Sequence, residues 1–397
     1  MNFPIYMDHH ATTPVDPRVL EAMMIYLTSE FGNASSASHP FGWHAEKAVE
    51  ASRAEIARFI HADPKEIIFT SGATESNNTV LKGVAEMYHE KGNHIITQAT
   101  EHKCILDTCK YLEKKGIKTT FLGVDNNGRI RLEDLKKAVT DKTILVSVMY
   151  ANNEVGTIQP IEEIGKLAKE KGILFHVDAA QAAGKIPMDV NALGIDFLCI
   201  SAHKMYGPKG IGVLYVRHQN PRVRLTPLLH GGGQENAMRS GTLNVPGIVG
   251  FAKACEIARK EMQEENKRVS ELRDRLEYGL QKELDYTFVN GHPIDRLANN
   301  LNMSFLYIEG ESLITAINGE IAVSTGSACT SGSKDPSYVL KAMGLPGDRM
   351  HSAVRFGLGR FNTLEEVDYV IDRVAMNVKK LRQLSALYPG PRAAGKS

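Results

Sequence analysis

Short apolar runs that alternate with helix-length amphipathic segments are the feature that most constrains the fold of this chain. The runs that favour β-strands are Glu66–Thr70, His94–Thr97, Thr143–Met149, Ile173–Val177, Phe197–Ile200 and Gly212–Val216. Helical patterns separate several of them, such as Pro160–Lys171, where Ile161, Ile164, Leu167 and Ala168 share one face. Nearly continuous apolar strands separated by helices predict a mostly parallel sheet covered on both sides. Ligands of such sheets bind in the loops beyond the carboxyl ends of the strands.

The length and a change of pattern predict two domains. The 397 residues suffice for one large domain and a smaller one. After about Gly250 the chain continues as a long, highly charged helical stretch, Phe251–Leu284. We expect an α/β domain at residues 16–260, and a smaller α+β domain formed by residues 1–15 and 261–397.

Composition excludes several classes of protein. The formal net charge of +1 points to neither nucleic acid nor an anionic membrane surface. No apolar run approaches the roughly 18 residues that a membrane span needs, and Met1–Tyr6 lacks the basic start of a secretory signal. Five cysteines are an odd number, which argues against a disulfide framework. We therefore expect a cytoplasmic protein with no membrane partner and no direct nucleic-acid partner.

A lysine stands at the end of one predicted strand. Ser201–Lys204 directly follows the apolar run Ile195–Ile200. A partly desolvated lysine amine can be neutral and nucleophilic, and can hold an aldehyde cofactor as a Schiff base. Taken alone, Lys204 is more simply interpreted as a surface lysine in a turn, so the other stretches must decide.

Two further strand ends offer an anion site and a carboxylate. Ser71–Glu75 is a strand–turn–helix junction of small residues, and the N–H groups of a helix start can bind a phosphate. Thr74 is expected to cap this helix, and a plain capped helix would explain the stretch equally well. Asp178 ends an apolar strand, where a buried carboxylate needs a partner such as a protonated pyridine nitrogen. Capping of the next helix is the alternative for Asp178.

Amide and imidazole groups complete the inventory. Asn152–Gly156 ends a strand with amides that can hydrogen-bond a ring hydroxyl, and His102 offers a flat face for stacking on a planar ring. A lone histidine is more often structural. Together with Ser201–Lys204, however, these stretches supply a phosphate cradle, a ring platform, a ring-nitrogen partner and a Schiff-base lysine, which indicates pyridoxal phosphate.

One cysteine lies in an unusual context. Cys329 stands in the Gly/Ser/Thr-rich run Ser324–Ser333, which cannot pack as a core and predicts a mobile, exposed loop at about residues 324–335. An exposed thiol is prone to oxidation, which suggests use as a nucleophile rather than an incidental surface cysteine. Arg355, in a strand-like pattern, could grip a carboxylate with two hydrogen bonds or form an ordinary ion pair.

Two other cysteines superficially suggest a metal site. Cys104 and Cys109 lie near His102, but their spacing fits no common zinc pattern. On a helix the two side chains would not share a face well. We predict that both cysteines pack in the core.

With these residues the chain resembles, over nearly its whole length, the cysteine desulfurases of the NifS/IscS type, which are class V aminotransferases. The stretches that carry the resemblance are Ala11–Pro14, Phe31–Asn33, Thr70–Glu75, Glu101–His102, Asn152–Glu154, Asp178–Gln181, Ser201–Lys204, His230–Gly233, Arg239–Thr242, Gly326–Ser331 and Arg355–Phe356. The resemblance implies pyridoxal-phosphate fold type I, with a mostly parallel seven-stranded sheet and a smaller α+β domain.

The resemblance also implies roles for individual residues. Cofactor-binding residues would be Ala73, Thr74, His102, Asn153, Asp178, Gln181, Ser201, His203, Lys204 and Thr242. Among them, Lys204 would form the Schiff base, Asp178 would hold the ring nitrogen, and Asn153 and Gln181 would contact the ring oxygen. Thr242 would reach the phosphate from the second subunit of a homodimer. Asn33 and Arg355 would bind the substrate carboxylate.

The implied activity is conversion of L-cysteine to L-alanine, with Cys329, Lys204 and His102 as catalytic residues. Lys204 would remove the Cα proton, Cys329 would take the sulfur as a persulfide, and His102 would shuttle a proton. An iron–sulfur scaffold protein would accept the sulfur, and tRNA-thiolation proteins are further acceptors. Cys329 would also be a transient ligand of a cluster held by the scaffold. Two departures are the tail after Leu384, which leaves the partner open, and Asp8–His10, a variable stretch with no evident role in the chemistry.

Rival interpretations differ in what they require. A class V aminotransferase needs no thiol near the cofactor, so Cys329 argues against it, and a selenocysteine-selective lyase is the nearer alternative. A protein that only binds partners through this fold would be expected to lack Lys204 or Cys329, and this chain has both.

Overall fold

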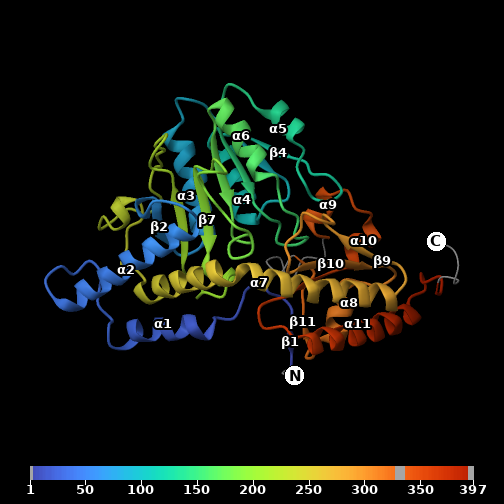
Figure 1. Cartoon of the computed structure of the whole chain (residues 1–397). Coiled ribbons are helices and arrows are strands. Elements are labelled where there is room, and N and C mark those ends of the chain that lie inside the picture. The colour runs from blue at the N-terminus through green and yellow to red at the C-terminus, as the bar shows by residue number, and fades with distance from the viewer. Residues whose placement is uncertain (1–2, 327–335, 392–397) are drawn as a thin grey trace.

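A seven-stranded sheet forms the centre of the larger part of the molecule (Figure 1). The computed structural model describes residues 3–326 and 336–391. In order across the sheet the strands are β2 (Ile67–Thr70), β8 (Gly212–Val216), β7 (Phe197–Ser201), β6 (Leu174–Asp178), β5 (Thr143–Met149), β3 (His94–Gln98) and β4 (Lys118–Leu122). β8 runs antiparallel to both neighbours, while the remaining neighbours pair in parallel. The predicted α/β class with a mostly parallel sheet is confirmed.

All the predicted apolar runs are strands, with bounds that differ by at most a residue or two. β4 was not predicted, because its sequence begins with Lys118, Thr119 and Thr120 and offers no apolar run. This strand pairs with β3 alone at the edge of the sheet, and its first four residues are exposed or half-buried. An edge position relaxes the need for apolar side chains on both faces.

Helices cover both faces of this sheet, as the alternating pattern predicted. They are α1 (Pro17–Thr28), α2 (Pro40–Phe59), α3 (Ala73–Met87), α4 (Lys103–Glu113), α5 (Leu132–Ala138) and α6 (Ile161–Lys171). α3 and α4 pack on one face, whereas α2, α6 and the first half of α7 (Val245–Glu283) contribute to the apolar core on the other. α6 buries Ile161, Ile164, Leu167 and Ala168, the predicted face. Each fully buried aliphatic side chain of this kind stabilises the fold by about 1.5–3 kcal/mol.

A second apolar core lies beside the first and is built mainly from the C-terminal part of the chain (Figure 1). Its elements are β1 (Ile5–Tyr6), β9 (Thr287–Asn290), β10 (Asn300–Phe305), α8 (Gly310–Ile317), β11 (Ile321–Ala322), β12 (Ala353–Gly357) and α11 (Leu364–Leu384). Two short helices, α9 (Tyr338–Ala342) and α10 (Gly347–His351), precede β12, and α9 packs in a small separate cluster with Val155. β12, β10 and β9 form an antiparallel sheet, and β1 pairs with β11. The expected division after residue 260 falls inside α7, which feeds both cores, and stays a prediction.

The structure also describes four of the five cysteines and the apolar character of the helices. Cys104, Cys109, Cys199 and Cys255 are free thiols, and Cys329 lies outside the described residues. Within residues 3–326 and 336–391, no helix combines the length and the apolar character that crossing a membrane requires.

Buried histidines make the fold sensitive to acid. Burial lowers the pKa of His176 from 6.5 to about 3, and the pKa of His9 from 6.5 to about 4. Their stabilising contribution is complete above pH 6.5 and is lost as the pH falls toward 4, because only the unfolded chain binds protons in that range. The expected loss is on the order of 1 kcal/mol per pH unit for each histidine.

Urea unfolding followed by circular dichroism at several pH values between about 7 and 5 measures this slope. The His176→Gln variant is the matched comparison, since it removes the histidine that touches Ser147 and Cys199. The variant should show a shallower pH dependence than the parent chain. Equal slopes in the two proteins would contradict the assignment of a neutral, buried His176.

Candidate active site

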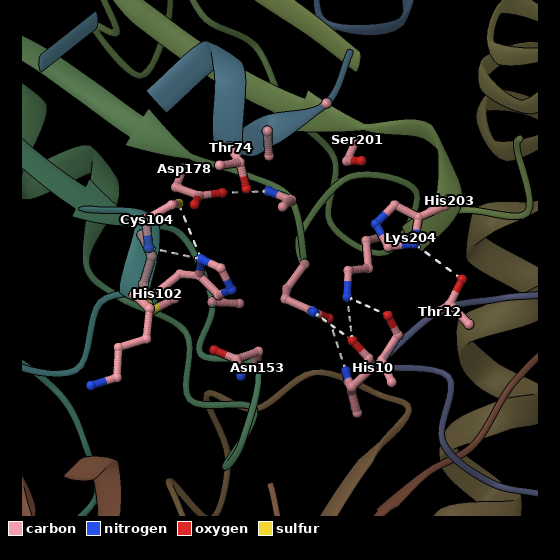
Figure 2. A pocket seen from close by; sticks show the side chains of 18 of the residues that line it. His10, Thr12, Thr74, His102, Cys104, Asn153, Asp178, Ser201, His203 and Lys204 are labelled. Carbon is pink, nitrogen blue, oxygen red and sulfur yellow. Dashed lines mark hydrogen bonds between the residues drawn. The ribbon is translucent and has the colours of Figure 1, made fainter. Parts of the chain in front are cut away.

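A cavity of about 680 Å³ opens at the carboxyl ends of the central strands (Figure 2). The predicted site residues that line it are Ala73, Thr74, His102, Asn153, Asp178, Gln181, Ser201, His203, Lys204 and Arg355. Gly326, the last described residue before the segment that holds Cys329, also lies on its wall. The fold thus brings ten predicted site residues from several separate stretches of the sequence together in one pocket.

The start of α3 points into this cavity without a side-chain cap. The N-cap is Gly72, with a φ of +148°, so the predicted capping by Thr74 is wrong and Thr74 lies inside the first helical turn. A Cβ at Gly72 would lie 3.6 Å from the Ser201 hydroxyl, in the space between the helix and β7. Helix N–H groups that no side chain satisfies, next to two hydroxyl groups, form an anion site.

Asp178 lies at the end of β6 with both carboxylate oxygens hydrogen-bonded. Asn77 donates from Nδ2 to Oδ2 at 2.7 Å, and the Ala180 N–H donates to Oδ1 at 2.9 Å. The side chain is buried but lines the cavity. Residues 180–185 form a turn and not a helix, so capping of a following helix by Asp178 is wrong, and the turn contact with Ala180 leaves the carboxylate on the cavity wall.

His102 is fixed by the start of α4, for which it is the N-cap. Its Nδ1 accepts the Cys104 N–H at 3.2 Å and lies 3.0 Å from Cys104 Sγ. A backbone N–H can only donate, so Nδ1 carries no proton and the neutral ring carries its proton on Nε2. The neutral ring can therefore donate a proton only at Nε2.

Cys104 differs from its prediction. Cys109 is buried between α3 and α4 as expected, whereas Cys104 is half-buried and lines the cavity. Asn77 Nδ2 donates to Cys104 Sγ at 3.2 Å, which links the thiol to the group that also holds Asp178. The position two residues after the helix-capping His102 was the signal for this contact.

Lys204 ends the short helix η2 (Ala202–Lys204) that follows β7. Its Nζ donates to the main-chain oxygens of His10 and Ala11 at 2.6 and 2.7 Å. Lys185 donates to the Lys204 carbonyl at 3.0 Å, and burial, with the nearby Lys204 charge, lowers the pKa of Lys185 to about 8. The main-chain oxygens of His10 and Ala11 thus hold the Lys204 amine inside the cavity (Figure 2).

His203 shares this short helix and turns toward the N-terminal segment. Its Nδ1 lies 3.0 Å from Thr12 Oγ1. Burial, together with the Lys204 and Lys209 charges, lowers the pKa of His203 to about 4. The ring is therefore neutral at pH 7.

Arg355, on β12, is almost fully buried and reaches the cavity from the second core. Its Nη1 donates to the carbonyls of Asn153 at 2.7 Å and Gly326 at 3.3 Å. Its Nη2 donates to Asp8 Oδ1 at 2.7 Å and Ser324 Oγ at 2.8 Å. Asp8, expected to have no role in the chemistry, is thus the ion-pair partner of this arginine.

Two predicted site residues, Asn33 and Thr242, do not line this cavity, and a third, Cys329, lies outside the described residues. Asn33 is exposed in the loop before α2, where its Oδ1 accepts the Ser35 N–H at 2.9 Å. Thr242 is exposed just before α7 and does not line this cavity, so its contact with a partner subunit's site stays a prediction. Cys329 lies outside the described residues, and its roles as sulfur acceptor and as transient cluster ligand stay predictions. In the described ranges, no group of three or more His, Cys, Asp or Glu side chains could hold a metal ion.

Two residues of the site were missed by the sequence analysis. His10 lines the cavity and is buried, although Asp8–His10 was expected to have no chemical role. Glu154 is also buried on the wall, where burial raises its pKa and Ser337 Oγ donates a hydrogen bond to it. Neither was predictable from one sequence, because their neighbours come from distant segments.

Comparisons with known proteins agree with this geometry. The family described as class-V aminotransferases matches residues 5–370. A protein named Cysteine desulfurase IscS from Rickettsia conorii is 56% identical over 388 residues, which cover 98% of this chain and 94% of that protein. A protein of the same name from Anaeromyxobacter sp. (strain K) is 58% identical, covering 98% of this chain and 96% of that protein.

Solved structures show the same fold. A NifS-like protein superposes with a TM-score of 0.89 at 42% identity, covering 95% of this chain and 100% of that chain. SspA, solved in complex with cysteine, has a TM-score of 0.79 at 37% identity, covering 90% of this chain and 100% of that chain.

The cavity fits pyridoxal phosphate, the cofactor of this family. The uncapped start of α3 can bind a phosphate, the Asp178 carboxylate can pair with a protonated ring nitrogen, and the Lys204 amine can react with an aldehyde. Asn153 Oδ1 is buried on the wall and has no hydrogen-bond partner among the described residues, which is expected where a ligand completes the site. The chain therefore belongs to the class-V aminotransferase family, as a pyridoxal-phosphate enzyme of the NifS/IscS cysteine desulfurase type.

Proposed function

We propose that this protein is a cysteine desulfurase that converts L-cysteine to L-alanine and collects the sulfur as a persulfide on Cys329. The observation that carries the proposal is the common cavity of Lys204, His102 and Arg355, whose wall includes Gly326 at the edge of the Cys329 segment. The reaction balances without an oxidant: the carbon–sulfur bond of cysteine breaks, a sulfur–sulfur bond forms on Cys329, and the Cys329 thiol proton ends on the alanine.

Pyridoxal phosphate, when bound, supplies an aldehyde that captures the substrate amine and a ring that withdraws electrons from Cα. Ala73, Thr74, Ser201 and His203 would hold the phosphate, Asp178 the ring nitrogen, and Asn153 and Gln181 the ring oxygen. His102 would stack on the ring. These are proposals supported by the shared lining of one cavity.

Lys204 is the proposed base for the Cα proton. Its amine is held in the cavity by two backbone carbonyls, and Lys185 lies beside it with a hydrogen bond to the Lys204 carbonyl. His102 is the proposed proton shuttle at the substrate sulfur. Because Nδ1 is occupied by the Cys104 N–H, the proton moves at Nε2.

Arg355 is the proposed partner of the substrate carboxylate. Both Nη atoms already have two acceptors each, and two of these, Ser324 and Gly326, belong to the segment that leads to Cys329. Arg355 Nε has no hydrogen-bond partner among the described residues, and a substrate carboxylate bound at an Nη atom would exchange a bond to that segment for its own. This exchange couples substrate binding to the segment that carries the nucleophile.

Replacing Arg355 by Lys is expected to raise the KM for L-cysteine by about ten- to hundredfold, because a planar two-pronged donor becomes a single ammonium. Steady-state alanine formation measures the change. Asp8→Asn is the matched control, since it removes the ion pair but keeps the guanidinium. Equal KM increases in both variants would show that Arg355 acts through the fold rather than on the substrate.

The partners follow from the same proposal. A homodimer would place Thr242, exposed here, at the phosphate of the other subunit. The persulfide would pass to an iron–sulfur scaffold protein or to tRNA-thiolation proteins in the cytoplasm. The curated relatives at 56% and 58% identity support this assignment through their names as IscS cysteine desulfurases.

An absorbance spectrum of the purified protein, followed by addition of L-cysteine, tests the proposed activity. The expected result is a yellow protein whose visible band shifts on cysteine addition, with alanine and reducible sulfur formed in equal amounts. A protein that produces an oxo acid without releasing sulfur would instead be an aminotransferase or a different lyase.

A further inference from the structure

His10 lies enclosed between the two cores, with both ring nitrogens hydrogen-bonded. It is 1% exposed and belongs to the segment that forms the floor of the cavity beside Lys204 (Figure 2). Its Nε2 lies 3.1 Å from Nδ2 of Asn300 on β10, and its Nδ1 lies 2.9 Å from Oε1 of Gln181 after β6. The ring therefore connects the second core to a proposed cofactor contact.

The hydrogen bonds determine where the proton on this ring resides. Asn300 Nδ2 also lies 3.2 Å from the Glu154 carbonyl, which can only accept a hydrogen bond. This end of the Asn300 amide is therefore the NH₂ group, and it donates to His10 Nε2 as well. With Nε2 accepting, a neutral His10 ring carries its proton on Nδ1.

The surroundings keep the His10 ring neutral. Burial lowers the pKa of His10 well below its usual value, and the positive charges of Arg355, Lys185 and Lys204 act in the same direction. The Gln181 contact opposes them with a smaller effect. At neutral pH, His10 is thus a single tautomer with an N–H at Nδ1.

Gln181 is held at both ends of its amide by the same residue. Its Oε1 accepts from His10 Nδ1, and its Nε2 donates to the His10 carbonyl at 3.0 Å. The carbonyl can only accept, so it identifies which end of the Gln181 amide is the NH₂ group, and the ring contact holds the other end. One N–H of Nε2 is not used by these contacts, and Gln181 lines the cavity, so the amide can donate to a ligand there while its Oε1 is turned toward His10 Nδ1.

We propose that His10 is a positioning residue that locks the Gln181 amide so that it presents an N–H, and no acceptor, to the ring oxygen of the bound cofactor. The inference rests on the proposed role of Gln181 at that oxygen. A fixed donor favours the ionised form of the oxygen and strengthens cofactor binding. The residue acts through Gln181 and not on the substrate.

A double-mutant cycle on cofactor affinity tests whether His10 acts through Gln181. His10→Ala and Gln181→Ala are each expected to weaken cofactor binding by about tenfold in equilibrium dialysis. The double variant should bind no more weakly than Gln181→Ala alone, because the second change removes nothing further. His10→Asn should restore most of the affinity, since its side-chain N–H can replace Nδ1–H. Additive losses, or a His10→Asn variant as weak as His10→Ala, would overturn the proposal.

A second readout needs no cofactor. Nitrogen NMR of ring-labelled, cofactor-free protein, with the His10 signal identified by its loss in His10→Asn, should show a neutral ring protonated at Nδ1. This state should persist as the pH falls below the usual histidine pKa of about 6.5. A charged ring or a proton on Nε2 in that range would overturn the proposal. Failure of alanine formation in the parent chain would instead count against the desulfurase activity, so the two failures are distinguishable.

Discussion

Replacing Cys329 by Ser should lower desulfuration of L-cysteine by at least about a thousandfold, because a serine hydroxyl cannot take up the substrate sulfur as a thiolate does. Formation of alanine with a thiol present as final sulfur acceptor measures the loss. Cofactor binding should not change, since the cavity residues that would hold the cofactor lie on other segments.

Cys104→Ser is the matched control for this experiment. Cys104 is the described cysteine that lines the cavity, and its thiol is already engaged by His102 and Asn77. A serine there keeps a donor at the same place and should retain most of the activity. If Cys329→Ser still turned over and Cys104→Ser did not, Cys104 would be the nucleophile.

The second large effect is expected at Lys204. Lys204→Ala removes both the proposed attachment point of the aldehyde and the base for the Cα proton, so turnover should fall by about 10²–10⁴-fold. The amine is held by the carbonyls of His10 and Ala11, and the variant leaves those groups in place. Single-turnover alanine formation by cofactor-loaded protein measures the effect.

The Lys185→Met variant tests whether the loss of turnover in Lys204→Ala comes from the chemistry of Lys204 or from the removal of a positive charge near the site. Lys185 is also buried beside the site, but its Nζ donates a hydrogen bond to the Lys204 carbonyl rather than lining the cavity. Its replacement should shift the pH dependence of turnover rather than abolish it. A partial rescue of Lys204→Ala by added small amines would support the role as base, and equal losses in both lysine variants would contradict it.

Elements with strong local patterns were predictable from the sequence. The apolar runs of β5 and β8 lie where the pattern placed them, and α6 buries the four residues of its predicted face. β4 escaped prediction because an edge strand needs few apolar residues. Thr74 was predicted as the N-cap of α3, but the N-cap is Gly72. Its positive φ lets the helix begin there without a capping side chain.

The site residues at strand ends were predictable for a related reason. The carboxyl ends of parallel strands lie at the same edge of a sheet. A predicted parallel sheet therefore also predicts that Asp178 and Lys204, which stand at the ends of two strands, lie near each other. The roles of Asp8 and His10 were not predictable, because they arise from contacts with Arg355 on β12 and Asn300 on β10. Such contacts between distant segments carry no local sequence signal.

Mass spectrometry of the protein after one turnover with L-cysteine tests the central claim most directly. The account predicts that the peptide containing Cys329 gains the mass of one sulfur atom, that alanine forms in equal amount, and that a reducing thiol removes the added mass. Alanine formed while the added sulfur sits on another cysteine, or on none, would contradict Cys329 as the sulfur acceptor.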